Sequence, residues 1–222
     1  MQKRSVLFGS YNTAAHGWTL TGYSLSDPEQ KTNYVEKPGG DGSWDLSTAL
    51  TDGIPRYKDR TLTVTLECSE GDRSYREDLI NDMVNLLDGL EWHTVLPDRP
   101  NHYLTGRLHV AVNSNSLAYA EVTVTGVVAS WFYSEKETAV TLVATAAEQT
   151  ATVRNGGRLI MVPSITVTGD NADVLLLYGT DSLALSTGTY KWPTLKLTPG
   201  DHVLRYSGTG TVVITYREAV LR

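Results

Sequence analysis

The stretch Thr61-Leu62-Thr63-Val64-Thr65-Leu66-Glu67-Cys68 alternates strictly between apolar and polar side chains. Because successive side chains of a strand point to opposite faces of a sheet, this pattern predicts a strand with one buried and one exposed face. The same alternation recurs over residues 104–112 and 120–125. Strands of this kind are typical of antiparallel sheets. We therefore expect a mainly β protein whose N-terminal part is an antiparallel sheet.

One segment after this strand follows a helical period. Its apolar residues recur every three or four positions, at Tyr75, Leu79, Ile80, Met83, Leu86, Leu87 and Leu90. Ser74 and Glu77 have the spacing of a capping box, and Gly89 suits the position after a helix end. The pattern predicts a single helix over about 74–88, with Asp78, Asp82 and Asp88 on its outer side.

A long excursion precedes the 61–68 strand. Residues 24–56 are rich in Gly, Pro, Asp and Ser and predict little regular structure. Loops of this length in compact domains are usually functional or disordered. The interleaved Trp44, Leu46, Leu50 and Tyr57 favour a segment that becomes ordered against another surface.

The C-terminal part has short strand patterns separated by turns at close, even spacing. Residues 150–153 and 159–162 flank Arg154-Asn155-Gly156-Gly157, which predicts a hairpin. Further strands are expected at 165–168, 174–178, 195–197, 203–206 and 212–217, with turns at Gly169-Asp170-Asn171 and Gly208-Thr209-Gly210. This predicts a β-sandwich over residues 139–222, following an N-terminal domain of residues 1–138.

Composition excludes several classes of protein. The chain has 222 residues and a net charge of −6, and residues 61–98 alone hold nine acidic and two basic residues. This balance disfavours nucleic acid as a primary partner. The single cysteine, Cys68, excludes an internal disulfide framework. The apolar run Val6-Leu7-Phe8 is too short for a signal-peptide core, and no stretch is apolar enough to span a membrane, so we expect synthesis in a cytoplasm.

No motif predicts catalysis, a cofactor or a metal site. The five histidines lack the spacing of a local metal pair, and there is no Gly-x-Ser-x-Gly or phosphate-binding glycine loop. A pair of carboxylates that meets only in three dimensions stays open as an alternative. The 12 Tyr and 5 Trp against 2 Phe indicate rings with polar edges, which favour interfaces over dry cores.

Three stretches resemble the distal tail protein (Dit) family of long-tailed bacteriophages. The first is Pro55-Arg56-Tyr57 leading into the basic-headed strand at 60–67. The second is Leu87-Asp88-Gly89 followed by residues 94–107, which contain an Asp-x-Pro turn and an aromatic strand ending in Gly-Arg. The third is residues 153–165 together with the ending Val212-Val213-Ile214-Thr215-Tyr216-Arg217. By order of elements the likeness covers nearly the whole chain.

The resemblance implies a non-enzymatic virion protein at the distal end of a phage tail. It implies a split-barrel-like N-terminal domain that forms a ring of six copies, and a C-terminal sandwich similar to galectins and carbohydrate-binding modules. The expected partners are further copies of the chain, the tail tube protein, the tape-measure protein and tail-tip or receptor-binding proteins. Two sequence features agree with this expectation: the long excursion and the residues beside it suit subunit contacts at Trp44, Leu46, Arg56 and Tyr57, and the acid-rich 61–98 segment suits lumen acids at Asp78, Asp82 and Asp88.

Two alternatives remain open at this point. The chain could be a carbohydrate-binding sandwich protein of a phage adhesion device, with Tyr190 and Trp192 as the stacking platform. It could also be another tail component, such as a tube or tail-completion protein. The additional C-terminal sandwich, which a minimal tube subunit would not need, favours the distal tail interpretation.

Overall fold

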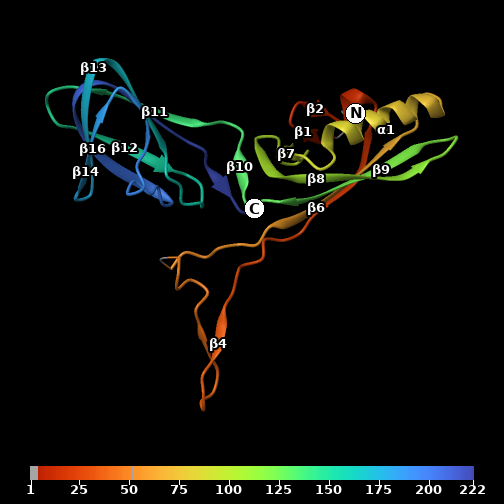
Figure 1. Cartoon of the computed structure of the whole chain (residues 1–222), viewed down its shortest axis with the longest axis horizontal. Coiled ribbons are helices and arrows are strands. Elements are labelled where there is room, and N and C mark those ends of the chain that lie inside the picture. Colours follow the sequence, from red (N-terminus) through yellow and green to blue (C-terminus); the bar gives the residue numbers. More distant parts are fainter. Residues whose placement is uncertain (1–4, 52) are drawn as a thin grey trace. The chain divides into compact units, whose positions relative to one another are not determined.

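The computed structural model describes residues 5–51 and 53–222. The chain divides into two compact units, Met1–Phe132 (unit 1) and Tyr133–Arg222 (unit 2). Both are built from antiparallel strands, and the described residues contain one α-helix (Figure 1). The predicted fold class, mainly β with one helix, a long arm and a C-terminal sandwich, is confirmed.

Unit 1 is organised around one curled antiparallel sheet. Its strands are β1 (Leu7–Phe8), β2 (Tyr11–Asn12), β3 (Thr19–Leu25), β6 (Arg60–Cys68), β7 (Glu91–Val95), β8 (His102–Asn115) and β9 (Ala120–Val128), and a short 3-10 turn, η1 (Ala14–His16), follows β2. The strand order is β2-β1-β7-β8-β9-β6-β3. In β6 the side chains of Leu62, Val64, Leu66 and Cys68 are buried, as their alternation predicted. The opposite face of β6 is left for Thr61, Thr63 and Thr65.

The helix α1 (Arg73–Leu87) covers the predicted segment, but its start and its buried face differ from the prediction. Asp72 caps it, because its carboxylate accepts a hydrogen bond from the Tyr75 N–H (2.8 Å), so the Ser74 capping box is wrong. The buried residues are Arg76, Ile80, Met83 and Leu87, whereas the side chains of Tyr75 and Leu86 are exposed. Gly89 follows the helix with φ +71°, as predicted.

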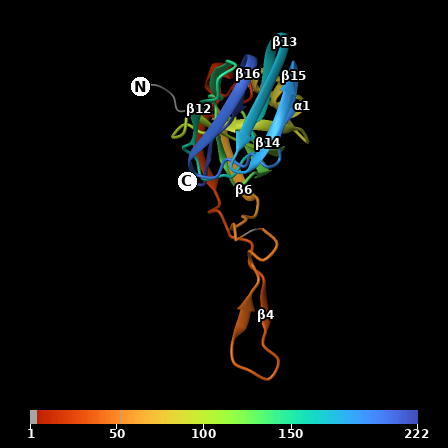
Figure 2. The ribbon, with the colours of Figure 1, turned by 90° about the vertical axis from the view of Figure 1, so that its left-hand side faces the viewer.

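The excursion between β3 and β6 contains a hairpin that the sequence pattern did not predict. Its strands are β4 (Tyr34–Glu36) and β5 (Ser43–Asp45), joined by a glycine-rich loop. Figures 1 and 2 show the two segments running side by side as an extended arm, in orange. A two-stranded hairpin is marginally stable by itself in water. The arm is therefore the part of unit 1 that most needs a partner.

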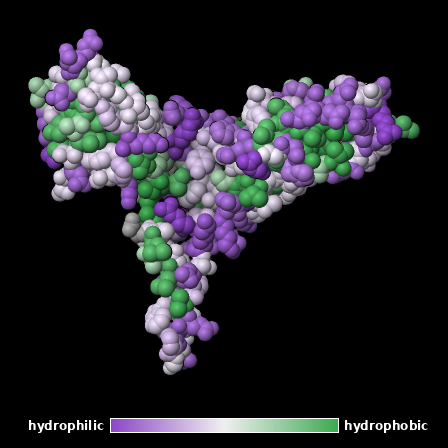
Figure 3. All heavy atoms as spheres, in the orientation of Figure 1, coloured by the Kyte–Doolittle hydropathy of each residue, from purple (hydrophilic) through white to green (hydrophobic). Residues whose placement is uncertain are grey.

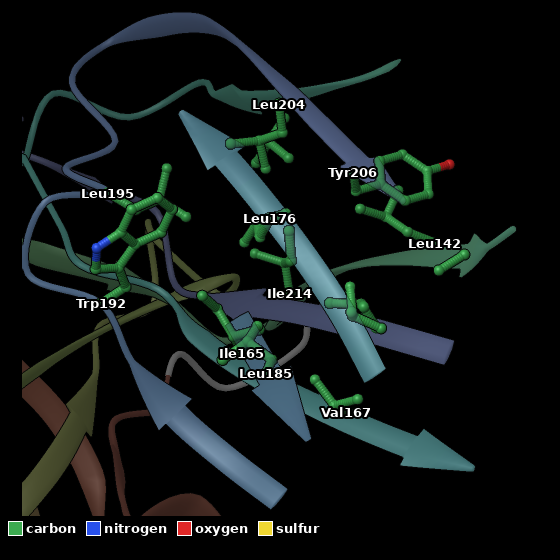
Figure 4. Packing of buried hydrophobic residues seen from close by; sticks show 14 of the residues in the cluster. Leu142, Ile165, Val167, Leu176, Leu185, Trp192, Leu195, Leu204, Tyr206 and Ile214 are labelled. Atoms are coloured by element: carbon green, nitrogen blue, oxygen red, sulfur yellow. The ribbon is translucent and has the colours of Figure 1, made fainter. Parts of the chain in front are cut away.

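Unit 2 is a six-stranded sheet that folds over on itself. Its strands are β11 (Thr138–Ala144), β12 (Gln149–Asn155), β13 (Ser164–Tyr178), β14 (Asp181–Ser186), β15 (Gly188–Lys191) and β16 (Gly200–Tyr216); β10 (Phe132–Ser134) precedes them and β17 (Ala219–Val220) follows. The first half of β13 pairs with β15 and the second half with β14. The second half of β16 pairs with β11 and the first half with β12. Two four-stranded layers result, and their inner side chains form the core (Figure 4).

The predicted turns at 169–171 and 208–210 are wrong, because both segments are bulges inside the long strands β13 and β16. The pairing shifts from Thr168–Thr211 to Asp173–Thr209. Gly169, Gly208 and Gly210 all have φ between +121° and +130° there. Glycine permits these angles, so each strand bends from one layer to the other without ending.

The predicted hairpin around Asn155-Gly156-Gly157 is also wrong. Asn155 is buried, and its side-chain amide donates to the carbonyls of Leu159 and Leu197, both at 2.9 Å, while its Oδ1 accepts from the Gly157 N–H at 2.9 Å. Residues 159–162 and 195–197 are not strands and meet in one isolated bridge, Met161 with Leu197. The Asn155 side chain thus holds two loop segments together, around residues 159 and 197, and no hairpin forms here.

Candidate subunit interface

The hairpin of the arm is apolar on one face. Val35 lies opposite Trp44 in the register, and the Leu46 N–H continues the ladder by donating to the Asn33 carbonyl (2.8 Å). Because side chains alternate along a strand, Val35, Trp44 and Leu46 share one face. We call these three residues the arm patch. Their exposed fractions are 41%, 51% and 42%, so a large part of each side chain stays open to solvent within the described residues; Figure 3 shows hydrophobic residues along the arm.

At the root of the arm the two segments pair with each other, and one ring packs against the rest of unit 1. Gln30 and Tyr57 form a bridge, the Lys31 N–H donates to the Arg56 carbonyl (2.8 Å), and the Lys58 ammonium pairs with the Glu29 carboxylate. The Tyr57 ring packs edge-on against the Trp131 ring, with 5.6 Å between centroids. These contacts fix where the arm leaves the sheet.

The four predicted interface residues therefore fall into two groups. Trp44 and Leu46 belong to the arm patch. Arg56 is exposed and Tyr57 half-buried, and both lie at the root, where Tyr57 packs within its own chain. Val35 completes the patch. It was not predicted, because its position opposite Trp44 depends on a hairpin that the sequence pattern did not indicate.

A second cluster at the root involves two arginines that sequence reasoning missed. The Arg60 guanidinium lies 5.3 Å and the Arg99 guanidinium 4.6 Å from the centroid of the Phe132 ring. The Arg60 Nε–H also donates to the Ser26 carbonyl at 2.6 Å. A cation near an aromatic ring is attracted by the negative face of the ring. Arg60 thus ties the root of the arm to the last residue of unit 1.

The three predicted lumen acids have different surroundings. Asp78 and Asp82 are exposed on α1. Burial raises the pKa of the Tyr11 hydroxyl, the hydrogen bond from Trp18 opposes this, and the charge of Asp82 adds a smaller rise. Asp88 caps the helix end, where it accepts from the Val110 N–H (2.9 Å) and pairs with His109 Nδ1 (2.6 Å).

Asp88 is thus part of a structural contact and does not form one cluster with the other two acids. The Val110 N–H is the main cause that lowers the pKa of its carboxyl, and His109 contributes less. The negative charge of Asp88 is therefore fixed at the junction of α1 and β8.

A groove of about 490 Å³ lies beside this pair on the outer face of the sheet. Leu108, Gly126 and Val127 line it with apolar surface, and the polar residues Thr61, Thr125, Arg107, Asp88 and His109 surround them. Val127 is an apolar residue that is 62% exposed, and its cross-strand neighbours are the polar residues Thr61 and Arg107. The Arg107 guanidinium donates to the Gly89 carbonyl, which holds it at the edge of the groove.

The predicted stacking platform in unit 2 does not form. Trp192 is only 7% exposed and belongs to the core cluster, and Figure 4 shows its ring among the packed aliphatic side chains. Tyr190 packs against the same cluster and its hydroxyl donates to the Ser186 carbonyl (3.2 Å). A buried indole cannot present its face to a sugar, so the ring that anchored this alternative is unavailable.

Within the described parts of the chain, 5–51 and 53–222, no three His, Cys, Asp or Glu side chains come together as metal ligands. Nor does the described structure contain a helix with the length and apolar character that crossing a bilayer requires.

No family model and no curated protein sequence matches this chain. Among solved structures it is similar to Dit (gp 19.1) of phage SPP1, a protein described as a paradigm of the hub adsorption apparatus in phages that infect Gram-positive bacteria. The two share 15% sequence identity with a TM-score of 0.67, and the match covers 96% of this chain and 98% of the SPP1 chain. The chain therefore has the Dit fold along almost its whole length.

Proposed function

We propose that this chain is a structural protein of a phage virion that forms a ring of six copies at the distal end of the tail. The ring would connect the tail tube to tail-tip or receptor-binding proteins. Support comes from the fold shared with SPP1 Dit, in a match that covers 96% of this chain. A shared fold alone does not define a function, and the surface of this chain must also suit assembly.

The observation that carries the proposal is the uncovered arm patch. Val35, Trp44 and Leu46 are exposed on one face of the β4–β5 hairpin. A hairpin with an apolar face gains stability when that face is buried. Contacts between an arm and a different surface of the next copy are heterologous, and heterologous contacts close into rings when the rotation permits.

The remaining surfaces receive roles that are consistent with a ring. Asp78 and Asp82 on α1 would contribute negative charge to the lumen through which DNA and the tape-measure protein pass, whereas Asp88 is held in its contact with Val110 and His109. Like charge keeps DNA from adhering to such a wall. Unit 2 would hold a neighbouring tail-tip or receptor-binding protein, and the protein would be made in the host cytoplasm before joining the virion.

Solution mass and electron microscopy test the ring. The purified full chain at tens of micromolar is expected to give closed rings, and Trp44→Ala is expected to shift it toward monomer while both units keep their thermal unfolding. Leu50→Ala is the matched control, since Leu50 is 99% exposed on the same arm but lies outside the patch. A wild-type chain that stays monomeric, with no ring in micrographs, contradicts the proposal.

A further inference from the structure

Each chain carries both an uncovered apolar patch and an unfilled apolar groove in unit 1. The patch consists of Val35, Trp44 and Leu46, and Leu108, Gly126 and Val127 give the groove its apolar lining. We infer that the groove beside Asp88 receives the arm patch of a second copy of this chain. The inference rests on the proposed assembly and names the surface that the arm contacts.

The chemistry of the groove matches that of a tryptophan. A buried indole needs an acceptor for its N–H, and Asp88 and Thr61, whose side chains carry acceptor oxygens, are among the lining residues. A guanidinium beside an indole ring gives a favourable cation–π contact, and Arg107 is available at the edge. Since Arg107 is already held by the Gly89 carbonyl and Asp88 by the Val110 N–H, little ordering is needed on binding.

In the described structure the patch of the same chain does not occupy the groove, because Val35, Trp44 and Leu46 are not among its lining residues. The groove begins at Thr61, whose N–H donates to Ser26 Oγ (2.9 Å) and whose carbonyl accepts from the Ser26 N–H (3.0 Å). From Thr61 the two segments of the root extend away from the sheet as a pair, joined at Glu29–Lys58 and Gln30–Tyr57. These pairings hold the start of the arm in its extended course, and a second copy can supply its patch without any change in them.

A mixing experiment on full-length chains tests the inference. Val127→Arg fills the groove with a charge and is expected to raise the concentration for half-assembly by about 30-fold, the effect of losing one central anchor. Val143→Arg is the control, because Val143 is also 62% exposed but belongs to unit 2. Thr61→Arg, from the neighbouring strand, is the second variant should Val127→Arg fail to fold.

The mixture gives the sharper result. A Trp44→Asp chain keeps its groove, and a Val127→Arg chain keeps its patch. In an equimolar mixture the only intact contact joins the patch of the Val127→Arg chain to the groove of the Trp44→Asp chain. We therefore expect mass photometry to show a heterodimer and no larger assembly. Assembly of Val127→Arg at the wild-type concentration, or a mixture that stays monomeric while the wild type assembles, overturns the inference alone. A monomeric wild type overturns the proposed ring as well.

Discussion

Arg76 is an arginine on the buried face of a helix, with 1% of its surface exposed. Its guanidinium donates to the carbonyls of Gly71 (2.7 Å), Ser116 and Leu117 (both 2.9 Å). It therefore fastens the start of α1 to the turn between β8 and β9. Hydrogen bonds from a charged donor are stronger than neutral ones, and the carbonyls lose their partners if the side chain is removed.

Replacing this side chain tests its role. Arg76→Ala is expected to lower the free energy of unfolding of unit 1 by about 3 kcal/mol, because it leaves a cavity and three carbonyls without their donor. Urea denaturation measures the loss. Arg73→Ala, an exposed position on the same helix, is expected to change it by less than about 0.5 kcal/mol. Equal losses in the two variants would contradict the anchoring role.

The bulge in β13 and β16 is the element on which the two-layered shape of unit 2 depends. A Cβ at Gly208 would lie 2.0 Å from the Asp173 carbonyl oxygen. Gly200 in the same strand has a similar φ of +116° but no heavy atom within 4 Å of such a Cβ. The two glycines thus separate backbone strain from steric collision.

Gly208→Ala is expected to destabilise unit 2 by about 1–3 kcal/mol more than Gly200→Ala. Both lose about 1–3 kcal/mol to the unfavourable φ, but only the first also forces the paired strands apart. Chemical denaturation followed by circular dichroism compares them. If Gly200→Ala proved as damaging as Gly208→Ala, the close approach of the strands would not be what requires glycine.

Elements whose pattern is local could be predicted from the sequence. The alternation of β6 gave its buried face because a strand between two neighbours obeys a period of two. The helix was predicted, but the predicted buried face differs from the observed one because Arg76, a charged residue, was assigned to the exposed side. Arg76 can be buried because its guanidinium donates to the carbonyls of Ser116 and Leu117, which are distant in the sequence.

Features that depend on distant partners could not be predicted. The glycines of the bulges were interpreted as turn residues, because glycine with a positive φ occurs both in turns and in bulges. The hydrogen-bonded pairing of β13 with β16, which continues past the bulge, is visible only in three dimensions. For the candidate interface, Trp44 and Leu46 were predicted, but the pairing that adds Val35 was not. Trp192 was misplaced because an indole suits both a core and an exposed platform.

At the scale of the whole molecule, the division into two units has an energetic consequence. The core cluster around Ile165, Leu176 and Trp192 lies entirely within unit 2. Two-state unfolding is a property of single domains, and a chain with two cores need not follow it.

Calorimetry is expected to resolve two unfolding transitions in the full chain. Arg76→Ala should lower the midpoint of one and Gly208→Ala that of the other, because each substitution lies in a different unit. A 1 kcal/mol loss shifts the midpoint of a domain of about 100 residues by about 4–8 °C. A single transition that both variants lower equally would show that the two cores unfold as one.

The order of strands in unit 1 also determines when the sheet can form during synthesis. Leu7 pairs with Val95, so the first strand made must wait until β7 has left the ribosome. The strands of the arm are separated by one short loop and can meet early. Contacts between distant residues form slowly, and exposed apolar segments are prone to aggregate meanwhile. The apolar residues of the arm patch are therefore synthesised before the sheet of unit 1 can close, so they are exposed to other chains while this chain is still growing.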